Sequence, residues 1–137
     1  MGHIEQQYQI TQWYPKPAVY DKYGWHQMPY LDQGEFFSEF GTFDVSITVP
    51  ENYVVGATGD LVDGEKETAW LNKLSEECKQ KKFDEKINLP NGKEVLKYND
   101  EFPLSSPTTK TLRFKQSKVH DFAWFCDKRY NVLKGEV

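Results

Sequence analysis

The residue types that most often bind metals or act as nucleophiles are few in this chain, which has three histidines and two cysteines. No two of His3, His26 and His120 have the i, i+4 spacing that places two imidazoles on one side of a metal. Cys78 and Cys126 lie in dissimilar settings, and neither has a histidine placed by sequence to activate it. We therefore expect no metal ligands here; two free thiols are the simpler interpretation, and one disulfide is the alternative.

Acidic residues offer a second route to catalysis. Asp32, Glu35 and Glu39 lie close together, and paired carboxylates can serve as acid and base, as in glycosidases. The polar edge of a strand is the simpler interpretation, because nothing in the sequence raises the pKa of one carboxyl above another. His120 and Asp121 are adjacent, so in a strand their side chains point to opposite faces. The sequence predicts no catalytic residue in this chain.

Aromatic residues form 15% of the chain, and many of them gather between Trp13 and Tyr30. Such rings can form a platform that stacks on sugars or bases. They can also fill the core of a small sandwich and cover its edge, and we favour this second interpretation. The residues concerned are Trp13, Tyr14, Tyr20, Tyr23, Trp25 and Tyr30.

Length and charge limit the class of protein. A chain of 137 residues has the size of one domain. Its net charge is −4 with both signs mixed, which argues against a nucleic-acid-binding face. No apolar run approaches the ~20 residues of a membrane-spanning helix, and no signal-peptide pattern opens the chain. Because Met1 precedes residues that read as the interior of a domain, we expect a part of a longer protein, here termed the parent protein.

Strand patterns dominate the sequence. In Glu35–Pro50, Phe43, Val45, Ile47 and Val49 alternate with polar residues, which is the period of a strand with one buried face. Further strands are expected at 8–14, where two prolines follow, at 53–55 and at 110–115, and a strand-like run precedes Gly41. The run 119–126 is almost wholly apolar and predicts a strand buried on both faces. A last strand is expected at 129–133.

Two segments differ from this pattern. Residues 18–34 predict an ordered loop, since a solvated linker would not carry so many aromatic residues without burying some. Residues 66–82 predict an amphipathic helix, because Trp70, Leu74 and Cys78 recur at intervals of four. After it, Asn91-Gly92 indicates one hairpin within an irregular stretch. The expected fold is mainly β, with antiparallel sheets and one amphipathic helix.

Two long segments of this chain resemble a known family. They are ITQWYPKPAVYDKYGWHQMPYLDQGEFFSEFGTFDVSITVPENYVVGATGDL and KTLRFKQSKVHDFAWFCDKRYNV. Both are similar to the amino-terminal β domain of the aminopeptidase N-like zinc metallopeptidases, most closely bacterial members of the Bacteroidetes kind. The resemblance covers Ile10–Leu61 and Lys110–Val132, and it implies that residues 63–109 are a helix-containing insertion. It also implies that residues 1–137 are a single, partial domain of sandwich or saddle-like shape.

The resemblance implies that the catalytic chemistry belongs to another domain of the parent protein. In that family the β domain packs on a thermolysin-like catalytic domain, which carries Gly-x-Met-Glu-Asn for the substrate amino terminus and His-Glu-x-x-His for zinc. Neither motif occurs in this sequence. The expected partners are thus the parent protein's own catalytic domain and the amino terminus of a peptide substrate. The zinc cofactor, the peptide hydrolysis and a periplasmic, secreted or cell-envelope location would belong to the parent protein.

The family's β domain also supplies a Thr-Gln-x-Glu/Gln segment that lines the pocket for the substrate's free amine. Here Thr11-Gln12-Trp13-Tyr14 matches it at Thr11 and Gln12, whereas Tyr14 replaces the Glu or Gln. The resemblance therefore implies substrate-binding roles for Gln12 and Tyr14, whose amide and phenol oxygens can accept hydrogen bonds from an ammonium group. The alternative is that Gln12 is an ordinary strand residue.

Three hypotheses follow for this chain. The leading one is a β domain, inactive alone, that forms one wall of an aminopeptidase cleft. The second is a carbohydrate- or peptide-binding module that uses the Trp13–Tyr30 aromatics. The third is an interdomain scaffold that does not touch substrate. Unpaired strand edges would also favour association with another copy.

Overall fold

The computed structural model describes residues 1–29, 37–81, 86–96 and 102–135. Short strands and one helix follow one another along the chain, with two much longer strands among them. In order, they are β1 (Gly2–Ile4), β2 (Gln7–Ile10), β3 (Val19–Asp21), β4 (Gly24–His26), β5 (Gly41–Pro50), β6 (Val54–Ala57), β7 (Asp60–Val62), α1 (Glu65–Lys79), β8 (Lys86–Asn88), β9 (Glu94–Leu96), β10 (Thr109–Val119) and β11 (Trp124–Asp127).

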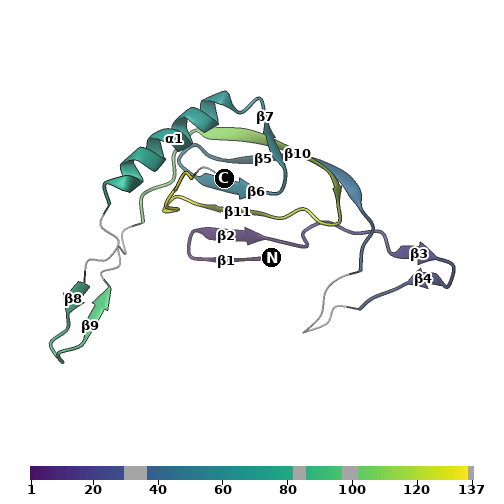
Figure 1. Cartoon of the computed structure of the whole chain (residues 1–137), viewed down its shortest axis with the longest axis horizontal. Coiled ribbons are helices and arrows are strands. Elements are labelled where there is room, and N and C mark those ends of the chain that lie inside the picture. The colour runs from purple at the N-terminus through teal and green to yellow at the C-terminus, as the bar shows by residue number, and fades with distance from the viewer. Residues whose placement is uncertain (30–36, 82–85, 97–101, 136–137) are drawn as a thin grey trace.

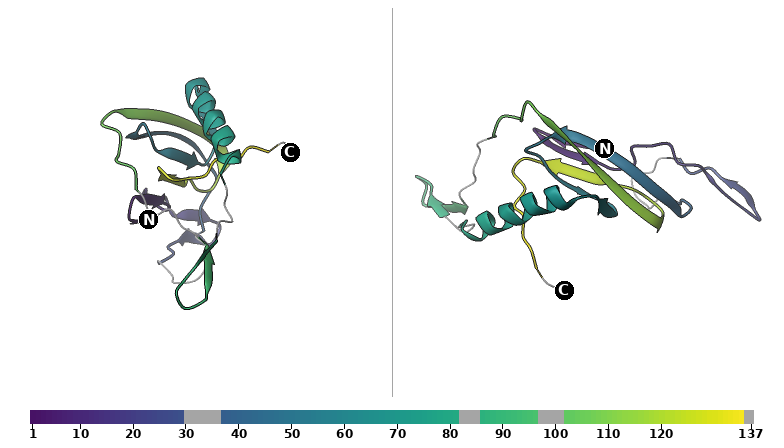
Figure 2. Two further views of the ribbon diagram at one scale, coloured as in Figure 1. Left: turned by 90° about the vertical axis from the view of Figure 1, so that its left-hand side faces the viewer. Right: turned by 90° about the horizontal axis from the view of Figure 1, so that it is seen from above.

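The strands form two main sheets and two separate hairpins, and every pairing is antiparallel. One sheet has the order β1-β2-β11-β6 and the other the order β5-β10-β7. The β3–β4 hairpin stands away from the sheets at one end of the molecule, and the β8–β9 hairpin at the other (Figures 1 and 2). The predicted mainly β fold with one helix is confirmed, and so is the hairpin across Asn91-Gly92.

The longest pairing joins β5 to β10 from Thr109 opposite Pro50 to Val119 opposite Gly41. Its register shifts between Ser117 and Val119, where a bulge interrupts β10. Side chains of β5 alternate between a covered and an exposed face along the whole strand, as the period-two pattern predicts. The strand predicted at 110–115 is confirmed and is longer than expected.

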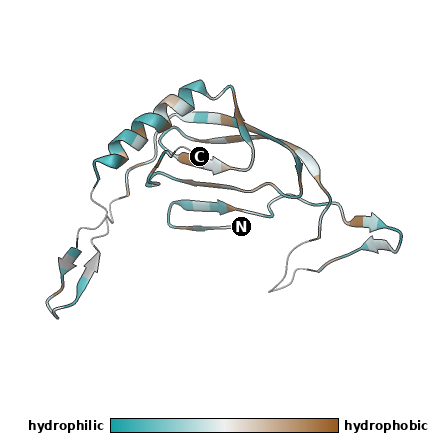
Figure 3. Ribbon diagram, in the orientation of Figure 1, coloured by the Kyte–Doolittle hydropathy of each residue, from teal (hydrophilic) through white to brown (hydrophobic). Residues whose placement is uncertain are grey.

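The hydrophobic core lies between the two sheets. Ile47 and Leu112 reach it from the three-stranded sheet, and Val55 and Cys126 from the four-stranded one. Phe122, which has no exposed surface, packs in this cluster and contacts the ring of Phe43. Figure 3 shows apolar residues scattered along the strands, whereas hydrophilic residues dominate α1. Most residues of this core cluster therefore come from strands, and among the described residues none comes from α1.

The helix α1 forms where the stripe predicts it, although it ends at Lys79 instead of residue 82. Glu65 and Glu67 lie in its first turn, where carboxylates interact favourably with the helix dipole. Cys78 is fully buried, and Trp70 and Leu74 are partly covered. The stripe is thus the face by which α1 packs on the sheets.

Two of the expected strands are shorter or interrupted. The strand predicted at 8–14 ends at Ile10, because Gln12 adopts a left-handed backbone with φ of 50° that cannot continue a strand. The run 119–126 is not one strand: the chain bends at His120, and pairing resumes at Trp124. The prediction of burial on both faces is wrong as well, since Phe125 is 38% exposed.

Three further predictions were wrong. Residues 129–133 form no strand, and the Arg129 backbone N–H instead donates to the Asp127 carboxylate at 2.8 Å. The 18–34 segment is not a loop throughout, because it contains the β3–β4 hairpin. Phe37 and Phe40 lie outside any strand and are exposed. The remainder of the predicted run before Gly41, residues 35 and 36, lies outside the described residues.

Replacing Gly59 by alanine is expected to lower the free energy of unfolding by about 2 kcal/mol or more. Gly59 has a φ of 94°, and a Cβ atom there would lie 2.5 Å from the backbone oxygen of Lys115. Urea unfolding measures the change. The matched control is Gly56→Ala, since nothing lies within 4 Å of a Cβ at that position. Equal stability of the two variants would contradict the expected clash.

Candidate functional site

The β3–β4 hairpin presents aromatic rings to solvent. Tyr20 and Trp25 are directly opposite each other in the pairing of the two strands, with ring centroids 4.9 Å apart. Tyr23 lies in the turn between them and is 81% exposed, and Trp25 is 66% exposed. We call these three residues the aromatic hairpin. Isolated exposed rings are common, but three on one hairpin are typical of an interaction surface.

Local contacts fix the shape of the aromatic hairpin. The Asp21 carboxylate accepts a hydrogen bond from the Tyr23 backbone N–H at 2.8 Å, and Gly24 supplies the φ of 104° that the turn requires. His26 Nε2 lies 2.9 Å from the same carboxylate oxygen, and this contact lowers the pKa of Asp21. Val19 is buried at the base. The rings are thus held on an ordered support.

The other predicted platform residues lie elsewhere. Trp13 Nε1 donates to the Phe122 carbonyl oxygen at 3.0 Å, and the Tyr14 ring packs edge-on against Phe43. The Tyr14 ring therefore joins the margin of the core, as the favoured interpretation predicts, whereas the Trp13 ring lies edge-on against Tyr14 and is 36% exposed. For Tyr20, Tyr23 and Trp25 that interpretation is wrong, because these rings are exposed. Tyr30 lies outside the described residues.

Gln12 and Tyr14, the residues implied by the family resemblance, have different environments. Gln12 is exposed, and its left-handed backbone places it beyond the end of β2. The Tyr14 hydroxyl donates to Asp121 Oδ1 at 3.0 Å. Burial, together with this bond to a carboxylate, raises the pKa of Tyr14 to about 12. Tyr14 is therefore a neutral phenol with a fixed partner, whereas the amide of Gln12 faces solvent.

Asp121 is the common partner in several contacts of this region. Lys16 Nζ lies 2.8 Å from Asp121 Oδ2, and the Phe122 backbone N–H donates to Oδ1 at 2.7 Å. Partial burial alone would raise the pKa of Asp121. The hydrogen bonds from Lys16, Phe122 and Tyr14 have the larger combined effect, so the pKa of Asp121 lies below its ordinary value. His120 instead contacts the ring of Phe40. The cluster joins the 13–16 segment to the bend at 120–123.

Tyr14 is expected to make stability fall in alkaline solution. Folding raises the Tyr14 pKa from its ordinary value near 10 to about 12. The contribution of the neutral Tyr14 phenol to the free energy of unfolding is therefore complete below pH ~10 and is lost as pH rises toward ~12. Urea unfolding of wild type and Tyr14→Phe across this range measures it, and the variant should lack that part of the pH dependence. Tyr20→Phe, at an exposed ring, is the control. Identical profiles for wild type and Tyr14→Phe would contradict the assignment.

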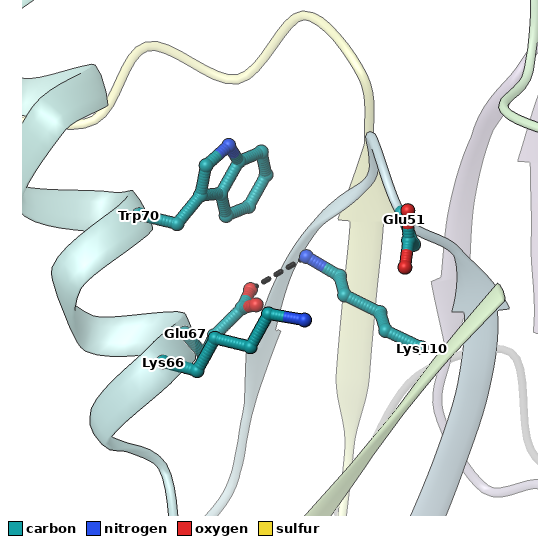
Figure 4. Close-up of a pocket in the computed structure, with 5 residues that line it drawn as sticks. All are labelled: Glu51, Lys66, Glu67, Trp70 and Lys110. Carbon is teal, nitrogen blue, oxygen red and sulfur yellow. Dashed lines mark hydrogen bonds and ion pairs between the residues drawn. The ribbon is translucent and has the colours of Figure 1, made fainter. Parts of the chain in front are cut away.

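A surface pocket of about 220 Å³ lies between α1 and the start of β10 (Figure 4). Lys110 Nζ lies 2.7 Å from Glu67 Oε1 and 3.8 Å from the centroid of the Trp70 ring. Glu51 and Lys66 complete the lining. Since the cation already has a carboxylate and an aromatic face as partners, this cluster binds α1 to the sheet. The pairing of Glu67 with Lys110 was not predicted from the sequence. The available signal was the position of Glu67, which shares a helix face with Trp70 three residues later.

The remaining candidates for chemistry are dispersed. Cys78 and Cys126 are both free and buried, and burial, with a smaller effect of Asp127, raises the Cys126 pKa to about 11. Within the described ranges, no group of three or more His, Cys, Asp or Glu side chains could hold a metal ion. Glu39 is exposed, and residues 32 and 35 lie outside the described residues. Among the helices that the structure describes, none is long and apolar enough to span a bilayer.

The aromatic hairpin is the feature of the described residues best suited to binding. It is exposed, its support is ordered, and its rings offer large apolar surfaces with polar tips. The Tyr14–Asp121 and Glu67–Lys110 clusters, in contrast, have their polar atoms paired within the chain. No known family model, curated protein or solved structure matches this chain.

Proposed function

We propose that this chain is a non-catalytic β domain that packs through its aromatic hairpin against a second protein domain. The supporting observation is the exposure of Tyr20, Tyr23 and Trp25 on a hairpin that stands away from both sheets. Tyrosine and tryptophan are enriched among the residues that dominate protein–protein binding energy. A hairpin fixed by its own turn and by buried Val19 would lose little conformational entropy on docking.

The second domain in this proposal is the catalytic domain of a zinc aminopeptidase, a choice that depends on the family resemblance. That domain would hold the zinc, which polarises the scissile carbonyl and activates water. This chain would form one wall of the cleft. Gln12 is available for the substrate, because its exposed amide oxygen can accept a hydrogen bond from a free amine. Tyr14 would shape the wall, with its hydroxyl proton directed to Asp121.

The experiment combines the parent reading frame with a binding assay. Sequence beyond codon 137 is expected to encode a His-Glu-x-x-His motif, and the encoded domain should bind this chain when the two are mixed. Trp25→Ser and Tyr23→Ser should each weaken binding at least tenfold, as expected for aromatic hot spots. The control is Leu104→Ser, another exposed apolar residue, outside the hairpin. A reading frame without the motif, or peptide hydrolysis by this chain alone, would refute the proposal.

A carbohydrate- or peptide-binding module is the second candidate, favoured by the exposed Tyr20–Trp25 ring pair. Tryptophan fluorescence during titration with a panel of glycans and peptides separates the two functions. A saturable change that disappears in Trp25→Phe would support direct ligand binding, whereas no response to any member of the panel would contradict this second function. In the assembled enzyme, unchanged kinetics of Gln12→Ala and Tyr14→Phe would favour a scaffold that does not contact substrate.

A further inference from the structure

The outer strands of the two sheets differ greatly in length. β1 and β7 have three residues and β6 has four, whereas β5 has ten. Among the described residues, β5 pairs only with β10. An outer strand presents a row of backbone N–H and C=O groups that can pair with another strand. β5 is therefore the main site on these sheets where a further strand could add.

Three of the usual protections of an edge strand, namely a lysine, an internal proline and a bulge, are absent from β5 itself. Its sequence GTFDVSITVP contains no lysine, its one proline is the last residue, and the bulge of this pairing lies in β10. Asp44 is its single charged residue. That carboxylate already contacts two cations of β10, with Arg113 Nη2 at 2.6 Å and Lys115 Nζ at 3.1 Å. The free edge is thus long, regular and nearly neutral.

The pattern of β5 is complementary to itself. In an antiparallel pair of two β5 strands with Ser46 opposite Ser46, Val45 faces Ile47 and Asp44 faces Thr48 of the second copy. Apolar side chains then share one face and polar side chains the other, because the side-chain period is two. The two Asp44 carboxylates lie four residues apart, so no like charges meet. The overlap spans residues 42–50, and its one proline, Pro50, lies at the end of the strand opposite Thr42 of the second copy.

We propose that a second copy of this chain pairs with the free edge of β5 in this antiparallel register, giving a continuous six-stranded sheet across a twofold axis. Such an edge-to-edge dimer extends the inner face, which already buries Ile47 and Val49, into the second copy. It uses β5 and not the aromatic hairpin, so it does not depend on the proposed function. Variants of Trp25 would leave the dimer unchanged.

Charged substitutions at Ser46 test the register directly, because this exposed residue would lie opposite Ser46 of the second copy at the twofold axis. Ser46→Glu and Ser46→Lys each place two like charges opposite each other, and we expect each homodimer to be about tenfold weaker. An equimolar mixture should form a heterodimer with affinity close to wild type. Sedimentation over a concentration series measures association, and the wild-type dimer has twice the mass of the 16.1 kDa chain.

The matched control is Ser117→Lys, the same substitution at an exposed residue of β10, which should leave the dimer unchanged. Recovery in the mixture would also show that both Ser46 variants fold. A wild-type chain that stays monomeric at all concentrations overturns the proposal. The proposal is also overturned if Ser46→Glu and Ser46→Lys each form a homodimer as tight as wild type, or if their mixture forms no heterodimer.

Discussion

Replacing Lys110 by methionine is expected to lower the free energy of unfolding by about 3–5 kcal/mol. The Lys110 and Glu67 side chains are only 14% and 9% exposed, so the variant leaves the Glu67 carboxylate covered without its cation. Loss of the cation–π contact with Trp70 acts in the same direction. Urea unfolding, followed by far-UV circular dichroism, measures the change.

The matched control is Lys86→Met, because Lys86 and Glu94 form an ion pair whose side chains are both well exposed. That variant should change stability by no more than about 1 kcal/mol. Adding Glu67→Met to Lys110→Met should restore much of the loss, since the double variant has no unpaired carboxylate. Equal effects of the two lysine variants would contradict the role of burial.

The second large effect is expected for Phe122→Ala, which should lower the free energy of unfolding by about 3–5 kcal/mol. Phe122 is fully buried and lies in the cluster to which both sheets contribute. Its removal leaves a cavity between the sheets, because neighbouring strands relax only partly around a lost ring. Urea unfolding is again the measurement.

Phe125→Ala is the natural comparison, since Phe125 lies three residues away and is 38% exposed. We expect it to change stability by about 1 kcal/mol. Both rings belong to the apolar run 119–126, so hydrophobicity alone ranks them equally. Similar losses in the two variants would contradict the core assigned to Phe122.

The elements with strong periodicity could be predicted from the sequence. The alternation at 43–49 gives β5, and the stripe of Trp70, Leu74 and Cys78 gives α1. Runs without periodicity could not be read in this way. In 119–126 the interruption depends on Asp121, whose carboxylate binds its own backbone neighbour as well as Tyr14 and Lys16. Two of its partners, Tyr14 and Lys16, are more than 100 residues away in sequence, so the sequence gives no local sign of them.

The candidate site was harder to predict than the fold. An aromatic residue has the same sequence signature whether it fills a core or faces solvent, so Tyr14 and Trp25 could not be separated. The difference arises from the β3–β4 hairpin, which stands away from the sheets (Figure 2) and leaves its three rings exposed. The Glu67–Lys110 pair was hidden because its members are 43 residues apart. Roles of Gln12 and Tyr14 in substrate binding stay predictions.

The pairing of β5 with β10 has a consequence for how the chain folds. Thr48 and Thr111, which share a hydrogen bond, are 63 residues apart, and α1 with the β8–β9 hairpin lies between them. Contacts of such large sequence separation slow folding, because the intervening chain must be closed before the strands gain anything from pairing. The closure entropy grows only logarithmically, by ~0.6 kcal/mol per doubling of the loop. Shortening the β8–β9 region would therefore speed folding only slightly, and it would raise the free energy of unfolding by a similarly small amount.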